Sequence, residues 1–537
     1  TYIIIGMSPK IKWLAWGAII VLLVCTRLIN LSWGLPYPFH PDERNMANAI
    51  QGLNCEISNF KFQISNCFNP HFFAYGQLPI YLGYALVLLS RITSRISGAI
   101  RFDEAVMALR FISFAASLLT AYVSFKILKQ FIPNTRYLLL YTLPLVFSPA
   151  LIQFAHFGTT ESLLMLIFTW LVYLCLKLGS KRDSKDVDSI YIWIGVVTGL
   201  AIATKVSSLL FAAVPFLTIS TSPRTFKNES KYEKFWQIFN ELIFVGFVTG
   251  ATAILFSPYN LISWKEFIGS IDYESMVATG KALVFYTRTF TESVPVLFQF
   301  ERIFPYALGW PVFVLFLIGF LTLPWKRNYN ILRVAFLIYF LPSAFLFTKW
   351  TRFMAPVMPL MVVIAVLFVS KLPKRLGYFA CLLLIIPGIL FLKVYTTPDV
   401  RFQASEWMDK NIPNNSYVLQ ETANVVDLPV YDRTYNLEHR AFKNISFNFY
   451  DLDADKKLQE DLLKHLKKAD YIIVPSRRIF KNHKADKYPI LNEYYDKLFS
   501  GKLEFKQVAE FKILDDEDAE ETWTVFDHPV VRIFKRM

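Results

Sequence analysis

Long apolar runs constrain this chain more than any other feature of its sequence. Three of them, Ile11 to Asn30, Trp236 to Phe256 and Leu376 to Val394, approach the ~20 residues that a helix needs to cross a bilayer core. A helix can cross because it satisfies its own backbone groups, which hydrocarbon cannot do. Only 18% of the 537 residues are charged, against about a quarter in soluble proteins. These observations predict an α-helical polytopic membrane protein.

The apolar runs predict about eleven transmembrane helices and one orientation for them. The predicted spans are 11–30, 104–127, 137–155, 160–178, 189–204, 206–221, 236–257, 303–323, 331–348, 354–370 and 376–395. Alternating crossings put the basic loops near Lys126, Lys177, Arg224, Lys326 and Lys371 on one side, together with Lys10 and Lys12. The positive-inside rule makes that side the cytoplasm, and we expect a multi-pass plasma-membrane protein. No A-x-A-like cleavage site follows the first run, so it is expected to stay as an anchor or first span.

The apolar segment from Gln77 to Ile92 requires a choice. If it crosses the bilayer, the basic loops that follow change sides and the charge pattern breaks. We therefore predict a helix that lies against or dips into the outer face. A protein with twelve spans is the alternative.

Two domains are expected. Residues 1–397 form the transmembrane domain, with outer-face loops 31–103 and 257–302, and residues 398–537 form an extracytoplasmic soluble α/β domain. In the second domain, the patterns predict helices at 404–411 and 456–468 and strands at 417–420, 471–474 and around 523–534. The acidic run from Asp515 to Glu521 is interpreted as a solvated loop.

The net charge of +14 does not indicate a nucleic-acid-binding protein. From Pro398 onward the chain has 22 basic and 25 acidic residues, which leaves 34 basic and 17 acidic residues in the membrane region. Positive charge in the membrane region is expected to fix the orientation of the spans and to bind anions near the bilayer. No nucleic-acid partner is expected.

Cysteine usage gives one candidate disulfide. Cys55 and Cys67 flank a short polar stretch of the first loop, and they can pair if that loop faces an oxidising compartment. Cys25, Cys175 and Cys381 lie in apolar runs and are expected to be packing residues.

The most informative polar motif, Phe39-His40-Pro41-Asp42-Glu43-Arg44, follows the first span. Pro41 suits the first position of a helix and acids suit its first turn, so a well-capped interfacial helix explains the motif by itself. The alternative is a site, because two carboxylates and a histidine beside a membrane can also serve catalysis.

The order of motifs resembles membrane glycosyltransferases of the GT-C type, which use polyprenyl-phosphate sugars. That group includes the protein O-mannosyltransferases and the aminoarabinose transferases of lipid A, which carry an acidic pair just after the first span. His-Pro-Asp-Glu at 40–43 matches this pair. Weaker similarities follow in the same order at 69–73, 75–82, 109–111, 159–161, 203–205 and 352–359.

The resemblance implies an inverting displacement, in which Asp42 is the base that deprotonates an acceptor hydroxyl and Glu43 orients the acceptor or the loop. Arg352 and Lys349 are the candidates for binding the donor phosphate, with Lys205 and Arg110 as further candidates. Membrane anchoring is the alternative role for Lys349, Arg352 and Lys205, and an ion pair with Glu161 or a first-loop acid is the alternative for Arg110. His40, Glu161, His71 and Tyr75 are assigned to the donor or acceptor sugar.

Two departures from the family pattern leave the acceptor open. The second acid is Glu161 where aspartate is more usual, and the tail is not closely similar to the mannosyltransferase lumenal domain. Protein, lipid and glycan acceptors are all compatible with the sequence. Polar and aromatic residues of the second outer loop, namely Asp272, Tyr273, Glu274, Tyr286 and Arg288, are candidates for an acceptor groove.

No cofactor is required by this chemistry, although a divalent metal is possible. His40, His71, His156, Asp42 and Glu161 all fall on the outer side, but no two of them show zinc-like spacing. The identity of any metal is unknown.

A transporter or flippase of lipid-linked or anionic substrates is the competing class. It shares the many spans and the intramembrane charge, but no internal duplication is visible and the acidic motif lies in a loop. A receptor or scaffold with an inert membrane part is a third class, which the intramembrane Arg110 disfavours.

Overall fold

The computed structural model describes residues 9–53, 68–132, 135–178, 184–221, 230–422, 425–431 and 439–537, without the side chains of 9–12, 135–137 and 184–186. The candidate Cys55–Cys67 disulfide lies outside the described residues, as do the basic loop residues Lys181, Arg224 and Lys227.

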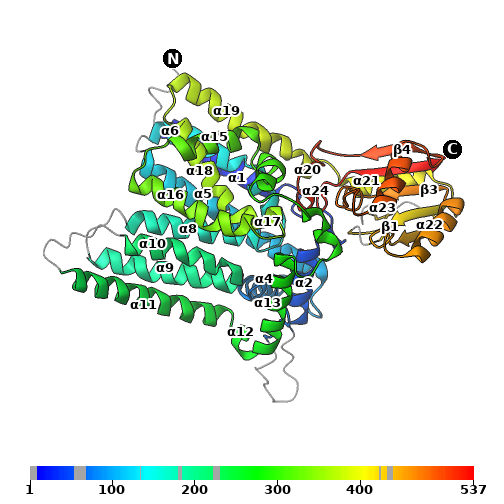
Figure 1. Cartoon of the computed structure of the whole chain (residues 1–537). Coiled ribbons are helices and arrows are strands. Elements are labelled where there is room, and N and C mark those ends of the chain that lie inside the picture. Colours follow the sequence, from blue (N-terminus) through cyan, green and yellow to red (C-terminus); the bar gives the residue numbers. More distant parts are fainter. Residues whose placement is uncertain are drawn as a thin grey trace.

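A large helical part is followed by a smaller domain built on a sheet (Figure 1). The helical part contains α1 Pro9–Leu28, α2 Pro41–Gly52, α4 Leu78–Ser94, α5 Phe102–Phe131, α6 Thr135–Val146, α7 Pro149–His156, α8 Glu161–Leu178, α9 Ser184–Thr204, η1 Val206–Ala212, α10 Ala213–Ser220, α11 Lys231–Phe256, α12 Tyr259–Ile262, α13 Trp264–Thr279, η2 Phe285–Phe290, η3 Gln299–Ile303, α14 Phe304–Ala307, α15 Trp310–Thr322, α16 Arg327–Ala344, α17 Thr351–Met354, η4 Ala355–Val357, α18 Met358–Val369, α19 Lys374–Phe391 and α20 Lys393–Thr396.

Within the described residues, six helical segments are long and apolar enough to cross a membrane, and two bent helix pairs raise the number to eight. The predicted spans 137–155 and 303–323 are these bent pairs, with angles of 50° and 116°. Pro149, which has no backbone N–H, starts the second half of the first pair. Gly309 joins the second pair at φ 82°, and only glycine fits there because a Cβ would lie 2.2 Å from the Pro387 ring.

The other three predicted spans, 11–30, 206–221 and 331–348, also coincide with helices, but these are shorter or less apolar. The region 206–220 is divided into a 3-10 helix and an eight-residue α-helix, η1 and α10. A count of eleven crossings therefore stays a prediction, whereas a polytopic helical fold is confirmed.

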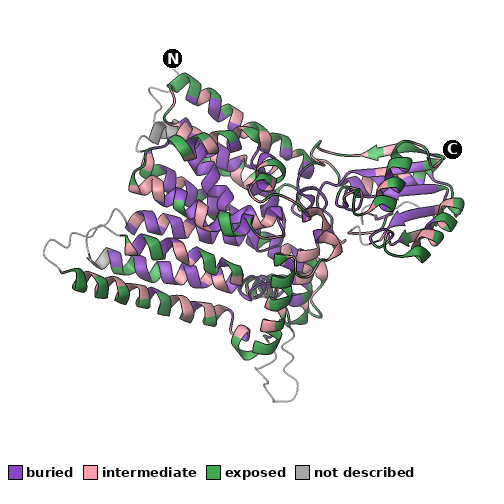
Figure 2. Ribbon diagram, viewed as in Figure 1, coloured by how far each residue is buried: buried purple, intermediate pink, exposed green. Residues whose placement is uncertain are grey.

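Burial separates central from peripheral helices (Figure 2). In α8 and in the segment Thr351–Val369, 83% of the most apolar window is buried inside the protein, but in α11 only 11% is. Helix α11 exposes large apolar side chains, among them Phe235, Trp236 and Phe247. Such exposure is expected for a helix that contacts lipid.

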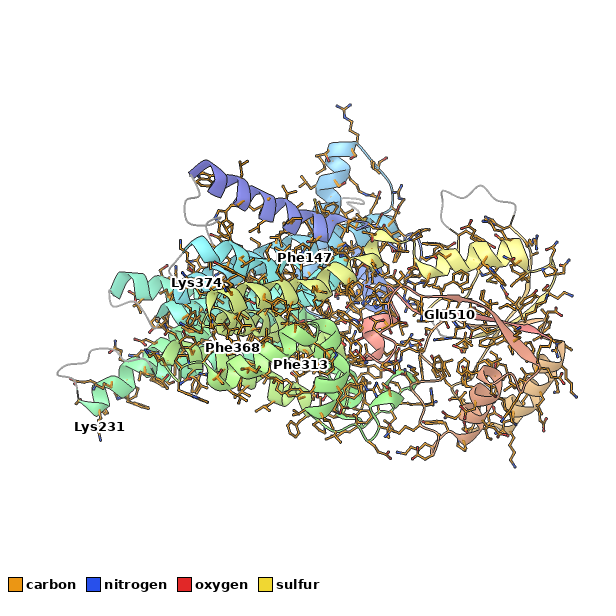
Figure 3. The ribbon with its side chains drawn as sticks, turned by 90° about the horizontal axis from the view of Figure 1, so that it is seen from above. Phe147, Lys231, Phe313, Phe368, Lys374 and Glu510 are labelled. Atoms are coloured by element: carbon orange, nitrogen blue, oxygen red, sulfur yellow. The ribbon has the colours of Figure 1, made fainter. Side chains whose placement is uncertain are left out.

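The basic loops and the smaller domain lie at opposite ends of the helical part. Lys231 and Lys374, which belong to the predicted cytoplasmic loops, lie at the end remote from Glu510 of the sheet (Figure 3). Helix α4, the segment for which we predict an outer-face position, lies with α2 and α13 at the end near the sheet (Figure 1). It buries Ile80 and Val87 on one side and exposes Leu89 and Ile92 on the other.

The smaller domain contains α21 Val400–Asn411, β1 Tyr417–Glu421, β2 Lys443–Phe447, α22 Lys456–Lys468, β3 Tyr471–Val474, α23 Pro489–Phe499, β4 Phe505–Phe511, α24 Glu521–Thr524 and β5 Val531–Arg536. The strand order is β2-β1-β3-β5-β4. Strands β1, β2 and β3 are parallel, and β5 pairs antiparallel with β3 and β4. The predicted α/β character is thus confirmed.

Two sequence interpretations in this domain were wrong. The predicted strand around 523–534 begins only at Val531, because Trp523 belongs to α24 and packs on Phe391 of α19. The acidic run is not wholly solvated either, since Glu520 and Glu521 are each 2% exposed.

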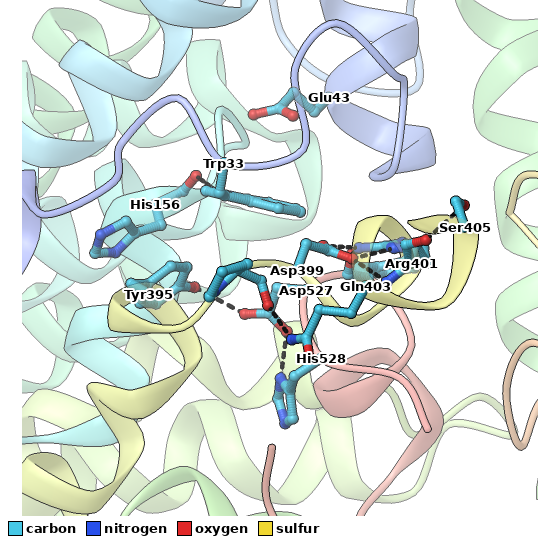
Figure 4. Close-up of polar contacts among 12 residues, drawn as sticks. Trp33, Glu43, His156, Tyr395, Asp399, Arg401, Gln403, Ser405, Asp527 and His528 are labelled. Carbon is cyan, nitrogen blue, oxygen red and sulfur yellow. Dashed lines mark hydrogen bonds and ion pairs between the residues drawn. The ribbon is translucent and has the colours of Figure 1, made fainter. Parts of the chain in front are cut away.

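The segment from Asp516 to His528 joins the two parts. Asp527 accepts a hydrogen bond from the Tyr395 hydroxyl at 2.7 Å and contacts the His528 ring at 2.5 Å (Figure 4). The other ring nitrogen of His528 contacts Asp516 at 2.9 Å, and Gln153 of α7 donates to the Trp523 carbonyl at 2.8 Å. These buried bonds seat the smaller domain on the helical part.

Candidate functional site

Helix α2 begins where the acidic motif predicts a helix. Pro41 occupies its first turn, and the His40 side chain caps it by accepting the Glu43 N–H at 3.4 Å. Burial, reinforced by the charges of Arg352 and Arg110, lowers the pKa of His40 well below its usual value, so the ring is neutral. Successive helical residues point about 100° apart, and Asp42 and Glu43 therefore reach different partners.

Glu43 is enclosed in a saturated network. Arg110 Nε and Nη2 donate to its two carboxylate oxygens at 2.7 and 2.8 Å, and the Gly158 N–H donates at 2.7 Å. Arg110 also donates to the Leu31 and Trp33 carbonyls, each at 2.8 Å. With both side chains under 5% exposed, this pair fixes the first loop to α5.

Asp42 instead forms an ion pair with Arg352 of α17, and both side chains remain about one-fifth exposed. The Arg352 guanidinium lies 4.5 Å over the Trp350 ring, and its Nη1 is 3.5 Å from the Tyr75 hydroxyl. Among the described residues, its buried Nε has no hydrogen-bond partner. The pair thus combines a carboxylate with a cation that has donor capacity left for an anion.

Lys205 brings a second cation to the same region. Its ammonium lies 5.0 Å over the Tyr75 ring and 5.3 Å over the Phe353 ring. The backbone next to Tyr75 lies directly against the end of α9, where the Gly76 N–H donates to the Thr204 carbonyl at 2.9 Å. Only glycine allows this close backbone approach, because a Cβ at Gly76 would lie 2.0 Å from the Ala203 oxygen.

Acidic groups from two further elements act on Lys205 and Tyr75. They are Glu161 at the start of α8 and Glu274 of α13. Burial and these two charges raise the pKa of Tyr75 well above its usual value, so its hydroxyl stays protonated. Glu161 is 2% exposed.

A narrow cavity connects part of this cluster with the smaller domain. Its volume is ≈ 10 Å³, about the room one water needs. The lining residues are His40, Gln153, Phe154, Phe157, Glu161, Thr351, Arg352, Thr522 and Phe526. Three sequence-predicted site residues, His40, Glu161 and Arg352, thus meet here.

Other predicted residues lie apart from the cavity lining. The Lys349 ammonium donates to the Phe347 carbonyl at 3.0 Å, and burial lowers the pKa of this lysine. His71 contacts Glu266 at 3.0 Å on an exposed surface. Arg288 turns toward the smaller domain, where it contacts the Tyr450 carbonyl and Asp451.

Within the part of the chain that the structure describes, the histidines assemble no metal centre. His156 is buried, stacks on Tyr395 with ring centroids 3.6 Å apart, and bonds to the carbonyls of Ile152 and Ile29. Among the described residues, no group of three or more His, Cys, Asp or Glu side chains is arranged to hold a metal ion. The possible metal among His40, His71, His156, Asp42 and Glu161 gains no geometric support.

Residues of the smaller domain were missed as site residues. Thr522 and Phe526 line the cavity, and Glu520 accepts hydrogen bonds from the backbone N–H and the hydroxyl of Thr351, both at 2.8 Å. In the sequence, Glu520 looks like one more charge of an acidic run. No local pattern indicated its burial.

The chain is similar to known proteins in part of its sequence and in its fold. Residues 91–244, which include Arg110, Glu161 and Lys205, match the dolichyl-phosphate-mannose-protein mannosyltransferase family. At the level of sequence, none of the curated proteins matches the chain.

The fold is similar to that of two kinds of solved structure. ArnT from Cupriavidus metallidurans bound to undecaprenyl phosphate has a TM-score of 0.52 at 12% identity, over 98% of this chain and 98% of that chain. The apo oligosaccharyltransferase from Archaeoglobus fulgidus has a TM-score of 0.50 at 12% identity, over 91% and 73% of the respective chains. The same figures hold for the archaeal AglB in complex with an inhibitory peptide and a dolichol-phosphate. The resemblance to GT-C-type membrane glycosyltransferases and the predicted fold class are confirmed.

Proposed function

We propose that this chain is an inverting glycosyltransferase that moves a sugar from a polyprenyl-phosphate donor to an acceptor hydroxyl on the outer face of the membrane. The observation that carries the proposal is the Asp42–Arg352 pair, which lies beside Lys205 and Tyr75. A candidate base and candidate phosphate-binding cations converge there from α2, α17 and the end of α9.

The two cations suit the donor phosphate. Arginine can bind two phosphate oxygens at once, and the unpartnered Nε of Arg352 leaves it such capacity. Lys205 adds a point charge where negative charge builds up on the leaving phosphate. In this proposal Arg110 has a structural role, because most of its donors already bind Glu43 and the carbonyls of Leu31 and Trp33.

The ion pair also supplies a way to activate Asp42. A donor phosphate that engages Arg352 competes with the carboxylate, which is then free to accept the proton of an acceptor hydroxyl. The acceptor oxygen bonds the anomeric carbon, the bond from that carbon to the phosphate oxygen breaks, and the phosphate leaves with the electron pair. Attack from the opposite face inverts the configuration.

The similar proteins support the donor class in general terms. One is bound to undecaprenyl phosphate and another to a dolichol-phosphate, so polyprenyl phosphates are the ligands to test first. Hexosyl and pentosyl donors are both compatible with the site, as are protein, lipid and glycan acceptors. The charge of Glu274 in α13 acts on Lys205, which supports an acceptor groove formed by the loop 257–302.

The basic end of the helical part supports the proposed orientation. Lys231 and Lys374 lie far from Glu510 of the sheet (Figure 3), whereas the cavity of the candidate site is lined in part by Thr522 and Phe526 of the smaller domain. If the basic end is cytoplasmic, the site and residues 398–537 are extracytoplasmic. A cysteine accessibility assay on intact cells, at positions near Lys374 and near Asp461, tests this orientation directly.

Product stereochemistry tests the reaction class. The purified protein in lipid is incubated with a panel of polyprenyl-phosphate sugars and a membrane extract, and the anomeric configuration of the product is determined by NMR. We expect a glycoside of opposite configuration to the donor. A product with retained configuration contradicts inversion, and substrate flux in sealed vesicles without a covalent product supports a transporter or flippase instead.

A further inference from the structure

The strongest unassigned feature is the contact between the smaller domain and the candidate reaction centre. The segment Glu520–Phe526 enters the helical part beside the cavity, and α24 lies at the junction of the two parts (Figure 1). Sequence reasoning gave this segment no role in the site.

Glu520 holds the start of the helix that carries Arg352. One carboxylate oxygen accepts both the Thr351 N–H and the Thr351 hydroxyl at 2.8 Å, and it also accepts the Thr522 hydroxyl at 2.5 Å. The backbone N–H of Glu520 in turn donates to the Arg302 carbonyl at 2.8 Å. Glu520 and Thr351 are each 2% exposed, so water does not compete for these bonds.

The same segment also holds the start of the helix that carries Asp42. The Phe526 ring lies 4.3 Å from the ring of His40, which caps α2 two residues before Asp42. The Phe526 carbonyl accepts a hydrogen bond from Arg401 at 2.7 Å, and this bond fixes the turn that follows α24.

Electrostatics point the same way. The negative charge of Glu520 acts on the Arg352 guanidinium. Glu520 therefore fixes the backbone at Thr351 and favours the charged guanidinium, but among the described contacts it makes no hydrogen bond to Arg352 itself.

We infer that Glu520 is a positioning residue of the smaller domain, which aligns Arg352 with Asp42, and that the segment Glu520–Phe526 forms one wall of the reaction pocket. This inference rests on the proposed function for what the aligned pair does. It gives the smaller domain a task in the reaction centre. The contacts that pack the smaller domain on the helical part then also align Arg352 with Asp42.

The test uses the full chain in lipid nanodiscs and the variant Glu520→Gln, which keeps the size of the side chain and removes its charge. Glu493→Gln is the matched control, because Glu493 lies on an exposed face of the same domain and pairs only with Lys497 among the described contacts. Thermal unfolding identifies any variant that fails to fold.

We expect Glu520→Gln to lower kcat for donor cleavage about 10- to 100-fold, the range for a displaced catalytic group, with KM for the donor within about threefold of wild type. In an Arg352→Lys background the same change is expected to lower kcat less than about threefold, because Glu520 acts through Arg352. The control is expected to behave as wild type. Wild-type kcat in Glu520→Gln, or equal effects in both backgrounds, overturns the inference.

Hydrogen–deuterium exchange separates this inference from the proposed function. The two carboxylate oxygens of Glu520 accept the backbone N–H groups of Thr351 and Thr522, whereas glutamine offers one neutral acceptor oxygen for both. The weaker bond to Thr351 predicts faster exchange of the peptide covering 349–355 in Glu520→Gln but not in Glu493→Gln. If the wild type cleaves no donor, the proposed function fails, and faster exchange confined to this peptide still supports the positioning role. Unchanged exchange overturns it.

Discussion

Arg110 donates two hydrogen bonds of 2.7 and 2.8 Å to the carboxylate of Glu43, whereas the adjacent Asp42 forms an ion pair with Arg352. One acidic pair thus serves two purposes. The buried Glu43–Arg110 pair ties the first loop to α5, and the Asp42–Arg352 pair, about one-fifth exposed, remains open to a ligand. This division yields separate expectations for the two carboxylates.

Glu43→Gln is expected to destabilise the protein by about 3–5 kcal/mol, because it leaves Arg110 as a buried charge without a counterion. Asp42→Asn is expected to cost less than about 1 kcal/mol, since its pair is partly exposed. Denaturant or thermal unfolding in detergent measures both. Equal destabilisation by the two variants would contradict the structural role assigned to Glu43.

Arg352→Lys is expected to weaken binding of polyprenyl phosphate about tenfold, because lysine keeps the charge but cannot form the bidentate hydrogen bonds of arginine. Titration with polyprenyl phosphate, followed by native mass spectrometry, gives the dissociation constant. Arg327→Lys serves as the control, since Arg327 lies at the start of α16, away from the cavity lining. Unchanged affinity in Arg352→Lys would remove Arg352 from the phosphate site.

Gly76→Ala is expected to cost about 1–3 kcal/mol and to reduce donor binding, because the new methyl group meets the Ala203 carbonyl and separates Tyr75 from Lys205. Gly246→Ala is the matched control, as a Cβ at that position meets no atom within 4 Å. Thermal unfolding and donor titration follow the two effects. An unperturbed Gly76→Ala protein would refute the close backbone approach.

The junction at His528 is expected to weaken in alkaline solution. Burial alone lowers the pKa of His528, but the charges and hydrogen bonds of Asp516 and Asp527 outweigh it and raise the pKa to about 10. Because the folded-state pKa lies above the unfolded one, this stabilisation is full below about pH 6.5 and declines until about pH 10.

The measurement is the unfolding temperature of wild type and His528→Gln between pH 6 and 11. The difference between the two proteins is expected to shrink steadily across this range. A constant difference would show that the histidine is not charged in the folded protein.

The membrane fold was largely predictable because hydrophobic runs report directly on crossing a bilayer. Each of the eleven predicted spans coincides with helix, but bends such as that at Gly309 depend on a contact with Pro387 from another helix. In the smaller domain, the amphipathic helix 456–468 was predicted at its observed bounds. Strand β2 exposes most of its side chains and gave no alternating signal.

The site was predictable only where one local motif carried it. Asp42 and its helix follow from the motif at 40–43, and the first-loop acid that pairs with Arg110 was among the alternatives considered. The pairing of Asp42 with Arg352 spans 310 positions of the chain and has no sequence signal. Glu520 was missed because burial of a charge depends on tertiary partners that composition does not reveal.

Release of free polyprenyl phosphate by wild type and Asp42→Asn tests the central claim most directly. Both proteins are purified in lipid and incubated with a panel of polyprenyl-phosphate sugars and a membrane extract, with Asp461→Asn as an exposed control. We predict release by wild type and by the control, and release by Asp42→Asn reduced by a factor of at least about 10². Equal release by wild type and Asp42→Asn, with matched folding, would contradict the assignment of Asp42 as the base.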